Sequence, residues 1–561
     1  MSEFGGLSIA LSSLQAQQRA LEIAANNVAN ANTPGYTRQA VDMTTLGGST
    51  VPAFFSTSTG DGDGVQISAV TRFRDAFMEI QAGLQHGSLA SLDQTNGTMQ
   101  QIQDVFPEPS DNGIAAQLAN FWSSFDSVAN NPGDPGTRSV LLQQAATVTQ
   151  SINSAATSLH QLATTETTQL GSLVSQINTT SSSLALVNQQ IQSGTVAGIN
   201  VNTLEDQRDS LAQTLAQLTG ATIQQGPNNQ VTVSLGGLNL VAENQSQALQ
   251  LDTSGPSAVL RAAQGGFAVN VTSGQAGGML HDINSVVPGY LTQLDGVATT
   301  LRDQVNNVTS AIGGTLAPSA LDQSGSGTLQ FQISLDGGAF STVSVAGADW
   351  SGAGGGAALQ TALQNAVNTA IGAGNATATV TTNGDGSLSI AIAPTGTHAL
   401  QVQASGTNAG FTTLLGTTPV GSDGIGGRDF FTGTNALTLA VSPLVAGNPS
   451  AVPAGVAGGG ALDGSVALQL ADMATSNTGA DATYNSMIVQ LGVDAKDVQT
   501  RDNVQQQSVQ NLDAARNAQA GVNTDEEMTN MVEYQKAYEA SAKFVTTLDS
   551  MLDTLINMVG A

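Results

Sequence analysis

The N-terminal segment carries an apolar stripe with helical spacing, and it constrains the fold more than any other feature. Four apolar residues recur every seven positions: Leu7, Leu14, Leu21 and Val28. Leu11 lies beside this row, and the opposite face is mostly Ser, Gln and Asn. A sustained heptad with one apolar face is typical of a helix that packs against another helix. We therefore expect residues 1–33 to form one amphipathic helix.

The C-terminal residues 524–561 repeat this arrangement. Five apolar residues with alternating spacings of four and three form a row: Phe544, Leu548, Met551, Leu555 and Met558. Further apolar residues widen the same face: Tyr538, Val545 and Leu552. Thr524 and Glu527 have the spacing of a capping box, which would begin a helix. About 35 helical residues would span roughly 50 Å.

Two interpretations of these terminal helices are open. Each helix could pack on the core of its own domain, or the two could pair with each other and with neighbouring subunits. We favour the second, because neither helix has a compact pattern beside it. Alone, such helices are marginally stable, so we expect both ends to be disordered in the free monomer. The predicted assembly interface consists of Leu7, Leu11, Leu14, Leu21, Val28, Tyr538, Val545, Leu548, Leu552 and Leu555.

The middle of the chain alternates between two periodicities. Helical spacing predicts four long helical regions: 135–192, 204–218, 280–312 and 462–520. Asp134 and Pro135 are typical of a helix start. Alternating residues around Gly236 and Gly237 predict a β-hairpin over 231–241. Residues 317–425 are rich in Gly, Thr and Ser and contain strand patterns around a short helix at 357–371.

This order predicts an α+β multidomain fold. Its N- and C-terminal helices would pair as a coiled-coil-like stem, followed by an elongated helical bundle and outer β-rich domains. The predicted domains are a terminal helical stem (inner tube) of 1–33 plus 524–561; a helical bundle of 34–220, 278–316 and 462–523; a β-rich domain of 221–277 plus 426–461; and an inserted β-rich variable domain at 317–425.

Composition excludes several classes of protein. The chain has 561 residues, 42 acidic and 14 basic side chains, and a net charge of −28, which argues against nucleic-acid binding. It has no cysteine, so disulfides and thiolate metal sites are excluded. No apolar run is long enough to insert into a membrane. The first ten residues lack a signal-peptide pattern, although the Gly-, Ser- and Asn-rich composition is that of an extracellular structural protein.

No catalytic, cofactor or metal site is predicted. The four histidines are widely separated in the sequence and have no metal-binding spacing: His86, His160, His281 and His398. The glycine-rich stretches are not followed by the Lys-Ser/Thr of a phosphate-binding loop. We therefore expect a protein that is not an enzyme.

Several motifs resemble those of one family. Residues 26–39 read Asn-Asn-Val-Ala-Asn-Ala-Asn-Thr-Pro-Gly-Tyr-Thr-Arg-Gln, and residues 534–543 read Tyr-Gln-Lys-Ala-Tyr-Glu-Ala-Ser-Ala-Lys. Both resemble the flagellar axial proteins, the family of rod, hook and hook-associated proteins. Residues 523–528 resemble the tail of the same family. Further, internal segments resemble the hook-associated members: 64–65, 71–77, 121–122, 130–133, 204–209, 288–291 and 430–433.

The resemblance implies a structural component at the junction between hook and filament. It implies self-assembly into a ring or short tube, with the hook protein below and the next hook-associated protein above. It implies a cytoplasmic flagellar export chaperone at the C-terminal helix, and secretion to the extracellular flagellum by the flagellar type III apparatus without a cleaved signal peptide. It also implies a joint between stem and bundle at Asn26, Asn27, Asn30, Thr33, Pro34, Gly35 and Tyr36.

Two alternatives remain. The chain could be another axial protein, such as a hook protein with inserts. The tail of the first motif, Thr-Pro-Gly-Tyr-Thr-Arg-Gln, and the long helix at 135–192 argue against it. Less favoured is an adhesin displayed through the 317–425 insert, because the acidic residues of the insert show no motif spacing.

Overall fold

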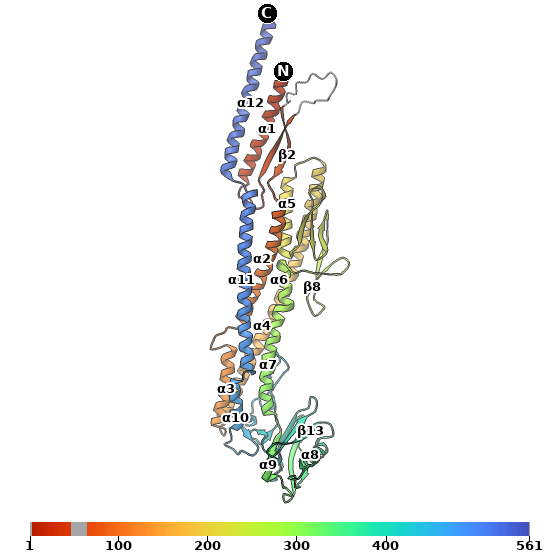
Figure 1. The fold of residues 1–561 in the computed structure, drawn as a ribbon, viewed down its shortest axis with the longest axis vertical. Coiled ribbons are helices and arrows are strands. Elements are labelled where there is room, and N and C mark those ends of the chain that lie inside the picture. Colours follow the sequence, from red (N-terminus) through yellow and green to blue (C-terminus); the bar gives the residue numbers. More distant parts are fainter. Residues whose placement is uncertain (1–2, 47–63, 560–561) are drawn as a thin grey trace. The chain divides into compact units, whose positions relative to one another are not determined.

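The computed structural model describes residues 3–46 and 64–559, and its helices and antiparallel sheets form an α+β multidomain fold (Figure 1). The chain divides into two compact units. Unit 1 comprises Met1–Thr98, Thr165–Asn284 and Asp497–Ala561. Unit 2 comprises Met99–Thr164 and Ser285–Lys496. The division into four domains stays a prediction.

The predicted helical regions are largely helical in the structure, but residues 30–33, 462–464 and 476–479 lie outside helices. The helices are α1 (Glu3–Ala29), α2 (Ala76–Val105), α3 (Ile114–Asn130), α4 (Pro135–Val196), α5 (Asn202–Thr219), α6 (Gly274–His281), the π-helical turn η2 (Asp282–Val286), α7 (Val287–Thr309), α8 (Gly355–Ile371), α9 (Gly410–Leu415), α10 (Ser465–Ala471), α11 (Ala480–Ala520) and α12 (Thr524–Val559). Short 3₁₀ turns are η1 (Pro227–Asn229), η3 (Pro318–Ala320), η4 (Pro449–Ala451) and η5 (Asp472–Thr475). The sequence patterns predict no element for α2 and α3.

Local sequence explains where the longest helix begins. Asp134 Oδ1 accepts a hydrogen bond of 2.8 Å from the Gly136 backbone N–H, as expected for a residue that caps a helix. Pro135 occupies the first helical position, where its missing N–H costs no hydrogen bond. The helix continues to Val196 and includes Gly171.

The capping-box prediction for α12 is wrong. The N-cap is Asn523, whose Oδ1 accepts a hydrogen bond of 3.1 Å from the backbone N–H of Asp525. Glu527 does not fold back onto the start of its own helix. Its carboxylate instead accepts hydrogen bonds from the amide of Asn27 in α1 and from the guanidinium of Arg38, just before β1.

Unit 1 contains a two-stranded hairpin and two small antiparallel sheets. Their strands are β1 (Gln39–Leu46), β2 (Gly64–Arg72), β3 (Thr222–Gln225), β4 (Val231–Leu235), β5 (Leu238–Ala242), β6 (Gln245–Ser246), β7 (Leu249–Asp252), β8 (Val259–Ala262) and β9 (Ala268–Val269). The predicted hairpin is β4–β5, with Gly236 and Gly237 in the left-handed turn that it requires. Apolar residues of α4, α5 and these sheets share one core, which includes Ile177, Leu215 and Leu240.

Unit 2 contains the other sheets, the largest in the order β12-β11-β15-β17-β16-β20. Its strands are β10 (Gly313–Leu316), β11 (Thr328–Leu335), β12 (Ser341–Ala346), β13 (Ala376–Thr382), β14 (Leu388–Pro394), β15 (Leu400–Ala404), β16 (Pro419–Val420), β17 (Ile425–Gly426), β18 (Phe431–Thr432), β19 (Ala440–Val441) and β20 (Gly455–Val456). The region predicted as an insert supplies most of one apolar core, in which Leu363 of α8 and Phe331 of β11 are fully buried, and Ile312 and Leu316 outside this region also belong to that core.

An aromatic cluster joins α3 to the segment around β18 within unit 2. The ring centroids of Phe121 and Phe431 are 5.6 Å apart, and those of Phe125 and Phe430 are 5.8 Å apart. The neighbouring Trp122 donates a 2.6 Å hydrogen bond from its indole N–H to Asp481. The motifs 121–122 and 430–433, which are distant in the sequence, therefore meet in one core.

Candidate assembly interface and joint

The terminal helices α1 and α12 pack against each other in antiparallel orientation (Figure 1). A methyl group on Gly6 would lie 3.5 Å from a methyl group of Leu548. Further along α1, the hydroxyl groups of Ser13 and Ser541 are 2.9 Å apart. At the end of the helix, Asn27 bonds Glu527. From one of these pairs to the next, the residue number rises on α1 by as much as it falls on α12. The two helices therefore keep one antiparallel register across the three contacts.

The leucine row on α1 is not its buried face. Buried positions are mostly small: Ala10, Ala16, Ala20, Ile23 and Ala24. Leu7 is 38% exposed and Leu11 is 54% exposed, although both are large and apolar. The remaining three predicted residues of α1 are half-buried: Leu14, Leu21 and Val28. Small side chains allow close approach of neighbouring elements, and they leave part of the leucine row facing outward.

The predicted residues of α12 divide in a similar way. Leu548 is buried, Val545 and Leu552 are half-buried, and Tyr538 is 41% exposed. The side chain of Leu555 lies outside the part of the chain whose side chains are described. Other large apolar side chains of α12 are exposed: Met528, Val532, Phe544, Met551 and Met558. The assembly role of these residues stays a prediction.

Asn27 organises the joint at the end of α1. Its side chain is fully buried and takes part in four hydrogen bonds. Nδ2 donates to the carbonyl of Gln39 at 2.8 Å and to Glu527 Oε2 at 2.9 Å. Oδ1 accepts from the hydroxyl of Tyr36 at 2.8 Å and from the backbone N–H of Gln39 at 3.0 Å. One amide therefore links α1, β1 and α12, with no net charge of its own buried.

Arg38 completes the joint. Its guanidinium contacts Glu527 at 2.7 Å and Glu526 at 3.0 Å, and it lies 4.9 Å from the centre of the Phe73 ring. The backbone N–H of Arg38 donates to the carbonyl of Ala520, the last residue of α11. Its own carbonyl accepts from the N–H of Phe73. The joint thus connects the end of α11, the start of α12 and the end of β2.

The pKa shifts at the joint follow from this geometry. Burial, with the negative charges of Asp206 and Glu527, raises the pKa of Tyr36 to about 12. Tyr36 is therefore a neutral hydrogen-bond donor at physiological pH. Burial lowers the pKa of Arg38, but Glu526 and Glu527 outweigh it, and the pKa rises above its ordinary value. The cation is therefore permanent.

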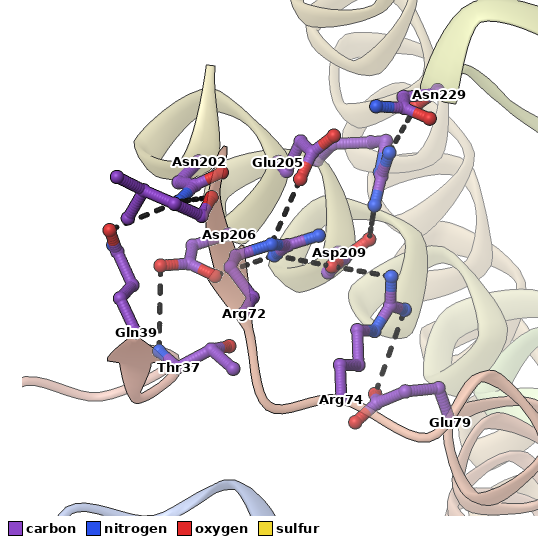
Figure 2. Close-up of polar contacts among 12 residues, drawn as sticks. Thr37, Gln39, Arg72, Arg74, Glu79, Asn202, Glu205, Asp206, Asp209 and Asn229 are labelled. Atoms are coloured by element: carbon purple, nitrogen blue, oxygen red, sulfur yellow. Dashed lines mark hydrogen bonds and ion pairs between the residues drawn. The ribbon is translucent and has the colours of Figure 1, made fainter. Parts of the chain in front are cut away.

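A second network fastens the hairpin to α5 (Figure 2). Arg72, at the end of β2, has a 7% exposed side chain and contacts three carboxylates of α5. The distances are 2.9 Å to Glu205, 2.6 Å to Asp206 and 3.0 Å to Asp209. Arg74 also contacts Asp209, at 2.7 Å. Burial alone would lower the pKa of Arg72, but these carboxylates raise it above its ordinary value.

Amides extend this network to the joint. The backbone N–H of Thr37 donates to Asp206 at 3.4 Å. The side chain of Asn202 donates to Gln39 Oε1 and to the carbonyl of Val70, both at 3.0 Å (Figure 2). The predicted segments 71–77 and 204–209 therefore meet each other and the joint in one polar cluster.

The other joint residues form the turn that leaves α1. The Asn30 amide donates to Asn26 Oδ1 at 2.7 Å, and the Thr33 hydroxyl donates to Asn30 Oδ1 at 3.1 Å. Pro34 is exposed, and Gly35 has a φ of 78°, which favours glycine. A groove of about 680 Å³ lies between this turn and α5. Its lining is mainly amides and hydroxyls.

Sequence reasoning missed the charged partners at this site. It did not identify Arg38, Arg72 or the carboxylates of α5 as contacts. A signal was present, because only 10% of the residues are charged while short segments around 72–75 and 205–209 are dense in charge. Within the described residues no cluster of His, Asp and Glu could hold a metal ion, and no helix has the length and hydrophobicity to cross a membrane.

The two ends of the chain match known families. Residues 7–37 match the family described as flagella basal body rod protein. Residues 516–558 match the flagellar basal body rod FlgEFG protein C-terminal family. These ranges cover most of the paired helices and the joint. The chain is therefore a structural axial protein of the bacterial flagellum.

A family match in the middle of the chain and two similar proteins show which kind of axial protein this is. Residues 99–315 match the flagellar hook-associated protein FlgK helical domain. The chain is 26% identical to flagellar hook-associated protein 1 of Bacillus subtilis, over 100% of this chain and 99% of that protein. It is 27% identical to the Escherichia coli protein of the same name, over 98% of each. The chain is thus a structural axial protein of the hook–filament junction, similar over its full length to flagellar hook-associated protein 1.

A solved structure is also similar. It is that of the flagellar hook junction protein FlgK from Burkholderia pseudomallei, with 19% identity and a TM-score of 0.48. The similarity covers 78% of this chain and 99% of that one.

Proposed function

We propose that this protein polymerises through the outward faces of the α1–α12 pair to build the junction between hook and filament. The observation that carries the proposal is the exposed apolar surface on both helices, including Leu7, Leu11 and Phe544. Contiguous exposed apolar side chains are uncommon on soluble monomers and mark interaction surfaces. Burial of such surface between equivalent subunits would drive assembly, at about 25 cal/mol per Å² of apolar area.

The joint supports a mechanical role for this pair. Asn27, Arg38 and Glu527 fix the base of α1 against that of α12, and Arg72 fixes the hairpin to α5. Force applied to the terminal helices would pass through these contacts into the rest of unit 1. This function requires no chemistry, and we infer that the protein is not an enzyme.

The similarity to flagellar axial proteins supports a proposal about the partners and the location. We infer that the subunits contact one another, the hook protein below and the next hook-associated protein above. We also infer that an export chaperone binds α12 in the cytoplasm before secretion to the extracellular flagellum. The match of residues 99–315 to a hook-associated helical domain favours this role over that of a hook protein with inserts.

Negative charges placed at the exposed positions Leu7 and Leu11 of α1 test the proposal. The double variant Leu7→Asp, Leu11→Asp should remain folded, because both side chains are exposed, but it should fail to assemble. Motility and electron microscopy of flagella would measure assembly, and circular dichroism of the purified chain would measure folding. Ser8→Asp, at an exposed polar position of the same helix, is the matched control. Normal, firmly attached filaments with the double variant would refute the role of this face.

A further inference from the structure

A buried cluster of two carboxyl groups and one hydroxyl lies within unit 1. Glu166 of α4 is 2% exposed, and Asp282 of η2 is 0% exposed. The hydroxyl of Thr98 on α2 contacts both: it bonds Glu166 Oε1 and lies 2.9 Å from Asp282 Oδ2. The carbonyl of Gln94 lies 3.2 Å from the same hydroxyl. Three helical segments that are distant in the sequence therefore meet at one oxygen atom.

The hydrogen bonds of this cluster cannot all form if both carboxyl groups are ionised. A threonine hydroxyl has one proton to donate, and three acceptor oxygens surround it here. A protonated carboxyl group supplies the missing donor, since its O–H can bond Thr98 Oγ1. The remaining oxygens, Glu166 Oε2 and Asp282 Oδ1, have no hydrogen-bond partner. Two ionised carboxylates would therefore be buried without enough donors, which is strongly unfavourable.

Within the described part of the chain, no cation is among the groups that act on Glu166 or Asp282. The groups that act on Glu166 are Asp282 and Thr98, and those that act on Asp282 are Thr98 and Thr95. Burial raises the pKa of Glu166 to about 7, with Asp282 adding to the rise and Thr98 opposing it. Burial also raises the pKa of Asp282 to about 6, opposed by Thr98 and Thr95.

Several titratable groups close to the cluster in sequence, or on α11, have surroundings or partners of their own. His281 precedes Asp282 and is exposed. A second carboxyl pair in unit 1 joins Asp93 of α2 to Asp502 of α11. Arg501, also on α11, has a 67% exposed side chain and pairs with Asp497.

We propose that Glu166, Thr98 and Asp282 form a proton-binding site that holds α2, α4 and η2 together, and that loss of the proton weakens this packing. The ligand is the proton, which the carboxyl groups and the hydroxyl of the cluster hold. The site contains none of the residues of the assembly interface or the joint, so it is independent of the proposed function. It makes the stability of unit 1 depend on pH near neutrality.

The direction of the pH dependence follows from proton linkage. In the unfolded chain both carboxyl groups have ordinary pKa values, 4.5 and 3.8, which are lower than in the folded chain. The folded state therefore binds more protons. The stabilising contribution is complete below about pH 4 and is lost as the pH rises through about 6 to 7. In that interval the unfolding equilibrium constant should rise by up to about tenfold per pH unit for each proton bound.

Urea unfolding of the full chain between about pH 5 and about pH 8 tests the site. We expect the wild type to lose stability as the pH rises. Glu166→Gln should lose less stability over this range, since its amide donates a hydrogen bond without a charge. At about pH 8 it should be more stable than the wild type. Asp104→Asn removes an exposed carboxylate from the same helix α2 and should leave the wild-type slope unchanged. Asp93→Asn measures how much of the pH dependence of stability comes from the Asp93–Asp502 pair.

The outcomes decide between a proton site and ordinary packing. Equal pH slopes for the wild type and Glu166→Gln would overturn the proposal. Asp282→Asn should also flatten the slope, because it too mimics a protonated acid. If both amide variants failed to fold at pH 5, the neutral form would not be the stable one and the proposal would fail. Infrared spectra should show a protonated carboxyl band near neutral pH that Glu166→Gln removes, and absence of this band from the wild type would also contradict the site.

Discussion

At the residue scale, polar side chains rather than apolar ones determine how α1 ends. Asn27 is separated from Glu527 by 500 positions in the sequence, yet their side chains are 2.9 Å apart. An asparagine here satisfies four hydrogen-bonding groups without adding a charge to the site. A sequence pattern identifies the cluster of asparagines as unfavourable in a helix. It cannot identify which of them is buried, because the sequence does not show their contacts. Asn26 and Asn30 bond each other at the end of the helix, whereas Asn27 is buried.

Arg72 gives a strong prediction at the same scale. Arg72→Met would leave Glu205, Asp206 and Asp209 with one arginine fewer in a mostly buried site. Removal of one member of a buried ion network costs about 3–5 kcal/mol. Urea unfolding of the purified chain should show a loss of that size. Arg501→Met, which removes an exposed pair, should change the stability by less than about 0.5 kcal/mol. Equal effects of the two variants would show that the network does not stabilise unit 1.

At the element scale, periodicity predicts helices well and their partners poorly. The long helices α4, α5 and α12 were predictable, since their apolar faces are continuous. The buried face of α1 was not, because its alanines pack closely while the more conspicuous leucines remain partly exposed. Neither was the capping residue of α12: the helix begins at Thr524 as predicted, but Asn523 caps it. Glu527 has the spacing of a capping residue, and a tertiary partner determines its contact instead.

Two glycines provide a test of element packing. Gly64, at the start of β2, has a φ of 116°, and a Cβ there would clash with Ser12 Oγ on α1. Gly64→Ala should therefore destabilise the hairpin against α1 by about 1–3 kcal/mol. Gly171 lies inside α4, and a methyl group added there would have no neighbouring atom within 4 Å, so Gly171→Ala should stabilise by about 0.5–1 kcal/mol. Thermal unfolding would measure both, and a stabilising Gly64→Ala would contradict the described packing of β2.

At the scale of the whole molecule, composition and motifs predicted the class of protein more reliably than the site. The acidic composition argues against nucleic-acid binding, and the lack of cysteine rules out disulfides. The terminal motifs indicate an axial protein, and the family matches at both ends confirm this. The charged networks were beyond sequence reasoning, because their members come from distant segments. The buried carboxyl cluster was equally unpredictable, since neither Glu166 nor Asp282 stands out in its helical pattern.

The absence of cysteine allows a direct test of the central claim that the outward face of the α1–α12 pair is buried on assembly. A Leu11→Cys variant would carry a single thiol on that face, and Asn365→Cys would carry one on the exposed surface of α8. Alkylation of the monomer and of intact flagella should be compared. We predict that Cys at position 11 reacts in the monomer and is protected in flagella, whereas Cys at position 365 reacts in both. Equal reactivity at position 11 in monomer and flagella would contradict the account.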